Sequence, residues 1–162
     1  MPEGAARHFT ITRATIDDAD GILGCLRTAF ESYRAQYTPA AYEDTVMNAA
    51  TARQRIETMK VLVARGEQGT VVGTVGATVR GREGHIRGMA VVPAAQGMGV
   101  ADQLIESMEG ELSAAGCSFV TLDTTVPLVR AIRFYERHGY VRSGTIGDFF
   151  GMPLHEFRKY LR

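Results

Sequence analysis

The segment Met89-Ala-Val-Val-Pro-Ala-Ala-Gln-Gly-Met-Gly-Val-Ala101 combines residue types that can bind phosphate. It reads as a strand that ends near Pro93, a turn that carries Gly97 and Gly99, and the first residues of an amphipathic helix. Such a turn leaves backbone N–H groups without partners at a helix N-terminus, where the helix dipole also favours negative charge. The segment therefore predicts a site for a phosphorylated ligand that needs neither lysine nor metal.

The spacing of this segment excludes two common phosphate-binding motifs. A Walker loop needs Gly-x-x-x-x-Gly-Lys-Ser/Thr, and the chain has no Lys-Ser or Lys-Thr pair. A dinucleotide-binding turn needs a third glycine after Gly97-x-Gly99, which this chain lacks. What remains is Val91-x-Pro93 followed by Gln96-x-x-Gly99-x-Ala101.

This pattern resembles the coenzyme A signature, Arg/Gln-x-x-Gly-x-Gly/Ala, of the GNAT superfamily of N-acetyltransferases. A second segment, Ala131-x-x-x-Tyr135-Glu-x-x-Gly139-Tyr140, is similar to the superfamily's Ala-x-x-x-Tyr-Glu-x-x-Gly-Phe. Where many members carry asparagine, this chain has Leu128. The resemblance implies acetyl-CoA as the cosubstrate, and it implies that the following residues bind it: Met89, Val91, Gln96, Gly97, Met98, Gly99, Val100 and Ala101.

Tyr135 is the candidate general acid. A phenol is protonated at neutral pH and can donate a proton to a departing thiolate. Helical periodicity alone favours a core position for this tyrosine, on one stripe with Leu128, Ala131 and Ile132. The resemblance instead implies a catalytic tyrosine beside the coenzyme sulfur.

His85 is the candidate general base. Strand alternation predicts that His85, Arg87, Met89 and Val91 share one face. Counted back from Val91-x-Pro93, His85 falls where related transferases carry a glutamate or a histidine. An imidazole can take a proton from an ammonium, directly or through water. Three alternatives stay open: Glu83, expected in the preceding turn, as the base; a water relay; and a structural role for His85.

The resemblance implies an acceptor pocket between the first two helices and the loop that joins the last two strands. Aromatic side chains in these places are candidates to bind a small organic amine, although tyrosines on a helix also serve in packing: Phe30, Tyr33, Tyr37 and Phe149. The predicted reaction moves an acetyl group directly to a primary amine of a small molecule in a ternary complex. A protein or peptide acceptor and a non-catalytic acyl-CoA-binding module remain alternatives.

The order of predicted elements indicates one α+β domain over residues 1–162, layered α/β/α. The resemblance implies a GNAT fold, a mixed central sheet of about six to seven strands flanked by about four helices. Expected helices cover residues 15–30, 40–59, 99–115 and 127–138. Expected strands cover residues 9–14, 61–64, 71–79, 85–92, 119–123, 140–142 and 155–161.

Composition adds expectations about partners and compartment. The 162 residues carry 18 basic and 18 acidic side chains, so no net charge attracts nucleic acid or an anionic membrane. No apolar run reaches the length of a bilayer crossing and no secretory signal is evident, which predicts a cytoplasmic enzyme. Cys25 and Cys117 are expected to be reduced core thiols. No metal-ligand spacing occurs, so no metal is expected. A homodimer is compatible with the family, but no residue pattern indicates one.

Overall fold

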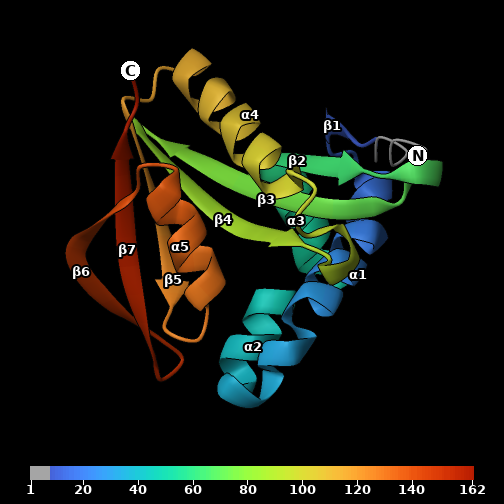
Figure 1. Cartoon of the computed structure of the whole chain (residues 1–162), viewed down its shortest axis with the longest axis horizontal. Helices are drawn as coiled ribbons and strands as arrows, with labels where there is room; N and C mark the ends of the chain where they lie inside the picture. The colour runs from blue at the N-terminus through green and yellow to red at the C-terminus, as the bar shows by residue number, and fades with distance from the viewer. Residues whose placement is uncertain (1–7) are drawn as a thin grey trace, which may run out of the picture.

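The computed structural model describes residues 8–162, in which seven strands form one mixed sheet with helices on both faces (Figure 1). The spatial order of the strands is β1-β2-β3-β4-β5-β7-β6, and within these residues only the β4–β5 pair is parallel. This arrangement confirms the predicted layered α+β fold. The strands are β1 (Thr10–Arg13), β2 (Lys60–Arg65), β3 (Val71–Arg80), β4 (Glu83–Val91), β5 (Phe119–Thr125), β6 (Val141–Phe149) and β7 (Met152–Tyr160).

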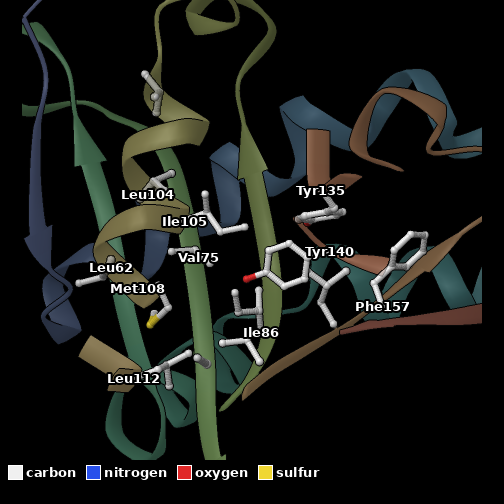
Figure 2. Packing of buried hydrophobic residues seen from close by; sticks show 14 of the residues in the cluster. Leu62, Val75, Ile86, Leu104, Ile105, Met108, Leu112, Tyr135, Tyr140 and Phe157 are labelled. Atoms are coloured by element: carbon white, nitrogen blue, oxygen red, sulfur yellow. The ribbon is translucent and has the colours of Figure 1, made fainter. Parts of the chain in front are cut away.

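Side-chain alternation on the central strands divides the core into two layers. Val61 and Val63 of β2 pack with α1 (Ala19–Phe30) and α3 (Ala49–Thr58) on one face. Leu62 and Ala64 pack with α4 (Val100–Ala114) and α5 (Val129–Arg137) on the other face (Figure 2). A short helix, α2 (Pro39–Val46), lies next to α1 (Figure 1). None of the helices within residues 8–162 has both the length and the hydropathy that a membrane crossing requires.

The prediction of a single helix over residues 40–59 is wrong, because the helix is interrupted at Met47. Met47 has a φ of 62°, which no α-helix accommodates, and α2 and α3 are separate helices. Each has its own N-cap. The Thr38 hydroxyl accepts a hydrogen bond from the N–H of Ala41, and the Asn48 side chain accepts one from the N–H of Thr51.

The last two strands are longer than expected. The sequence predicts a strand over residues 140–142, followed by a loop that contains Phe149. In the structure β6 runs to Phe149, and the chain turns at Phe150 and Gly151 into β7. Because β6 is an edge strand with nearly every residue exposed, it lacks the alternation of apolar residues that marks a half-buried strand.

A β-bulge interrupts β4 and changes which residues share a face. Gly76 of β3 pairs with Arg87 and Thr74 pairs with Ala90, so β4 holds one extra residue here. Gly88 adopts a φ of 67°, the left-handed conformation that such a bulge needs. The predicted common face of His85, Arg87, Met89 and Val91 is therefore wrong, since Met89 and Val91 pack with the α4 layer, to which Ile86 also belongs.

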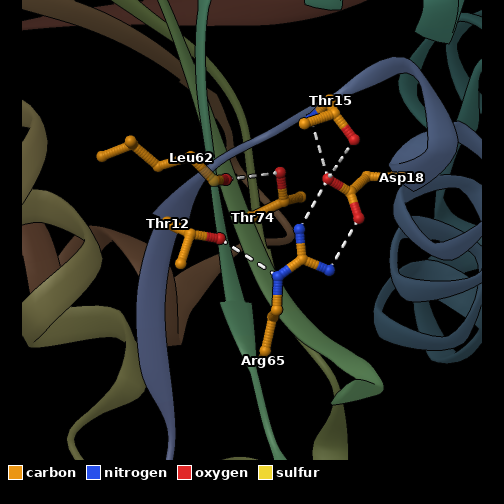
Figure 3. Close-up of polar contacts among 6 residues, drawn as sticks. All are labelled: Thr12, Thr15, Asp18, Leu62, Arg65 and Thr74. Carbon is orange, nitrogen blue, oxygen red and sulfur yellow. Dashed lines mark hydrogen bonds and ion pairs between the residues drawn. The ribbon is translucent and has the colours of Figure 1, made fainter.

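An ion pair joins the residue that precedes α1 to strand β2 (Figure 3). Both Asp18 oxygens accept hydrogen bonds of 2.7 Å from the Arg65 guanidinium. Arg65 also donates to the Thr12 hydroxyl at 3.1 Å, and the N–H of Thr15 donates to Asp18 at 2.8 Å. These contacts with Arg65 lower the pKa of the buried Asp18 carboxyl, although its burial acts in the opposite direction.

Candidate active site

A cleft of about 900 Å³ lies where β4 and β5 separate. The two strands pair only from Glu83, opposite Phe119, to Ile86, opposite Leu122. Beyond this point β4 continues to Val91 and β5 to Thr125 without pairing with each other. Residues of both of these diverging ends line the cleft. A cavity of this size accommodates a ligand as large as a drug molecule or a cofactor.

The turn between β4 and α4 forms one wall of the cleft. Gly97 and Gly99 have φ values of 81° and 82°, and a Cβ on either would meet only open space. Within the described chain, the backbone N–H groups from Gly97 to Asp102 donate to no protein acceptor. Open space and free donors at a helix N-terminus fit a pyrophosphate group. Met98 alone of the predicted loop residues does not line the cleft, because its side chain packs against the core.

Three arginines on α5 face the same cleft, and the sequence reasoning missed them. Arg130, Arg133 and Arg137 all line it. Arg130 also donates to the side-chain oxygen of Gln96 at 2.7 Å, and Gln96 in turn donates to the carbonyl of Val91 at 3.4 Å. The signal was available in the spacing of these arginines, because positions i, i+3 and i+7 share one face of a helix. They complement a ligand with several phosphates.

The free edge of β4 presents backbone groups to the cleft. The N–H of Val92 donates to the carbonyl of Val72 on β3 at 2.9 Å. Backbone groups alternate in direction along a strand, so those of Met89 and Val91 point the other way, toward the gap. Both residues line the cleft. That this segment holds an extended ligand arm stays a prediction.

Tyr135 lies in the last turn of α5, where it lines the cleft and is only 8% exposed. Its ring packs edge-on against Tyr140, with 5.9 Å between ring centroids (Figure 2). Burial raises the pKa of the Tyr135 phenol, so the group stays protonated at neutral pH. None of the described residues hydrogen-bonds to its hydroxyl, which leaves that proton free for a ligand.

His85 belongs to a buried chain of hydrogen bonds on the α1 face of the sheet. Its Nδ1 lies 2.7 Å from the Thr121 hydroxyl, and that hydroxyl donates to the Glu83 carboxylate. Since the only proton of Thr121 goes to Glu83, the network assigns the imidazole proton to Nδ1. The free lone pair of His85 is then on Nε2, which lies 3.4 Å from Asp123 Oδ2. Glu83 is the first residue of β4, which corrects its expected place in the turn.

An aromatic wall closes the α1 side of the cleft, and it brings together the four residues predicted for the acceptor pocket: Phe30, Tyr33, Tyr37 and Phe149. The Phe30 ring packs against Tyr33 and Tyr37, each at 6.2 Å between centroids. Tyr37 is buried, and its hydroxyl is 2.7 Å from that of Thr125 at the end of β5. This contact joins the segment after α1 to the margin of the gap.

Other reactive groups lie outside this arrangement. Cys25 and Cys117 are buried free thiols, and burial raises the pKa of Cys25 to about 12. Neither cysteine lines the cleft. Among residues 8–162, no three His, Cys, Asp or Glu side chains are grouped closely enough to hold a metal ion.

Comparison with known sequences assigns the chain to a family. The model of the acetyltransferase (GNAT) family matches residues 24–140, so the chain belongs to that family. An "IAA acetyltransferase" from Azospirillum brasilense is 35% identical over 101 residues, which are 61% of this chain and 65% of that protein. The chain therefore matches somewhat less than two thirds of the length of this relative.

Solved structures show the same fold at low sequence identity. The PaiA N-acetyltransferase of Thermoplasma acidophilum, solved in complex with coenzyme A, has a TM-score of 0.79 and 14% identity, over 92% of this chain and 98% of its own. The ribosomal-protein-S18-alanine N-acetyltransferase of Escherichia coli has a TM-score of 0.76 and 18% identity, over 94% of each chain. The seven-stranded sheet is thus the GNAT fold.

Proposed function

We propose that this protein transfers the acetyl group of acetyl-CoA to a primary amine of a small molecule. The observation that carries the proposal is the position of the free N–H groups of Gly97 to Asp102. These N–H groups open onto a cleft that Tyr135 and His85 also line. Tyr135 reaches the cleft from the α4 face of the sheet, and His85 reaches it from the opposite face. One ligand held by the loop can therefore extend through the gap toward both side chains.

The chain's own groups fit acetyl-CoA along its length. The loop N–H groups and the α5 arginines bind the phosphates, and the edge of β4 binds the extended arm. The cosubstrate supplies an acetyl thioester. A backbone N–H of Met89 or Val91, both directed at the gap, donates to the thioester oxygen and stabilises the charge that develops there.

During the reaction the amine nitrogen loses two protons and the departing sulfur gains one. His85 Nε2 accepts the proton of the substrate ammonium, directly or through water, and the Asp123 carboxylate stabilises the imidazolium. The amine nitrogen then bonds to the thioester carbon as the carbon–sulfur bond breaks. The nitrogen loses its second proton to water as the amide forms, and Tyr135 donates its proton to the departing sulfur and regains one from solvent.

The test is acetyl-CoA-dependent product formation over a panel of arylalkylamines, polyamines, aminoglycosides, amino acids and short peptides, detected by mass. Turnover of at least one small amine is expected. Exclusive turnover of peptides would replace the small-molecule acceptor with a peptide acceptor. Binding of acetyl-CoA with no turnover of any amine would contradict the catalytic role.

A further inference from the structure

Two arginines that have no partner among residues 8–162 line the cleft on the α1 face of the sheet. Arg55 of α3 and Arg87 of β4 both line it. Arg55 Nη1 lies 3.3 Å from the point where a Cβ on Gly88 would stand, so its guanidinium lies directly against the bulge in β4. Neither arginine forms a hydrogen bond or an ion pair with any residue in 8–162.

The charges of this arginine pair favour the binding of an anion. Burial and the charge of Arg87 both lower the pKa of Arg55, and the charge of Asp44 offsets this only in part. Arg65 shows the contrasting structural case, since Asp18 satisfies it with two hydrogen bonds. Asp44 also lines the cleft, but it forms no ion pair with either of these guanidiniums among the described residues. Two neighbouring guanidiniums that face a cleft in this way can bind a carboxylate, which arginine holds in bidentate geometry.

The coenzyme's phosphates are not that anion. The loop donors and the three α5 arginines lie on the α4 face of the sheet, whereas α3 covers the opposite face. The arginine pair lies on the same face as His85, because His85 and Arg87 are two residues apart and precede the bulge. The Cα atoms of two such residues are about 6.5 Å apart, a distance that one small molecule spans.

We propose that the acceptor is an amino acid with an apolar or aromatic side chain. This inference rests on the proposed function and specifies its substrate class. The amino group lies at His85 and Asp123, the carboxylate at Arg55 and Arg87, and the side chain against the aromatic wall. The arginine pair thus determines specificity and leaves the transfer chemistry to other groups.

Matched substrates test this assignment. Phenylalanine against phenethylamine, and leucine against 3-methylbutylamine, differ by the carboxylate alone. Wild-type kcat/KM is expected to be at least about tenfold higher for each amino acid. Arg55→Gln and Arg87→Gln should each raise KM for the amino acid and bring this ratio toward one. Arg53→Gln, exposed on the same helix, should leave the ratio unchanged.

A binding measurement separates this inference from the proposed function. By calorimetry, N-acetylphenylalanine should bind the wild-type protein more tightly than N-phenethylacetamide, and Arg55→Gln should remove the difference. Equal turnover of amines and amino acids, or an unchanged ratio in both arginine variants, overturns the carboxylate site and leaves the acetyltransferase proposal standing. If nothing is acetylated, the proposed function fails, and the calorimetry alone then upholds or refutes the carboxylate site.

Discussion

Among single residues, Tyr135 has the most sharply defined proposed role. If it protonates the departing sulfur, Tyr135→Phe should lower kcat by roughly two orders of magnitude and leave coenzyme affinity nearly unchanged. Tyr140→Phe is the matched control. It removes a buried hydroxyl that donates to Glu109 at 2.8 Å, outside the cleft, and should cost about 1 kcal/mol of stability without lowering kcat. Undiminished kcat in Tyr135→Phe would assign the acid role elsewhere.

Thr121 tests the hydrogen-bond chain behind His85. Thr121→Val keeps the shape of the side chain but removes the hydroxyl that links Glu83 to the imidazole. We expect a lower kcat, by about tenfold, with KM for acetyl-CoA unchanged, because the imidazole loses its fixed tautomer. Thr121→Ser restores the hydroxyl and should restore kcat. Equal losses in the valine and serine variants would point to packing instead of tautomer control.

At the scale of elements, the turn into α4 holds the phosphates through its conformation. Gly99→Val places a branched side chain at a φ of 82° and fills the open space over the loop. The affinity for coenzyme A measured by calorimetry should fall at least about tenfold. Gly110→Ala, exposed on the same helix, should leave that affinity unchanged. Wild-type affinity in a folded Gly99→Val protein would refute the assignment of the loop.

Some features of these elements could be predicted from the sequence and others could not. The loop was predictable because its glycines, its proline and the helix that follows are all local signals. The break at Met47 was not, because a non-glycine residue there adopts a φ of 62°. The bulge at Gly88 depends on pairing with β3, and it placed His85 and Met89 on different faces. Arg55 was missed because only the packing of α3 brings it to the cleft.

At the scale of the whole molecule, the Asp18–Arg65 pair joins β1, β2 and the start of α1. The folded state lowers the pKa of Asp18 below its ordinary value of 3.8. The pair therefore stabilises the fold fully above that pH, and the stabilisation is lost as the pH falls through the lowered value. Asp18→Asn should lower the free energy of unfolding by about 2 kcal/mol at neutral pH.

Urea unfolding across a pH series measures this contribution. The difference between wild type and Asp18→Asn should shrink as the pH falls below about 4. It should be lost once the pH is below the lowered pKa of Asp18, because that side chain is then uncharged, as asparagine is. Asp17→Asn, exposed beside it, should stay close to wild type at every pH. A stability difference that does not change with pH would show that the charge of Asp18 contributes nothing.

At the same scale, direct transfer requires acetyl-CoA and the acceptor amine to occupy one cleft at the same time. The most direct test is the initial rate with acetyl-CoA and the amine varied together. Direct transfer predicts double-reciprocal lines that intersect, because no acyl group rests on the protein; Cys25, buried with a pKa of about 12, is no nucleophile for one. Parallel lines would show a covalent acyl-enzyme and contradict direct transfer across the gap between β4 and β5.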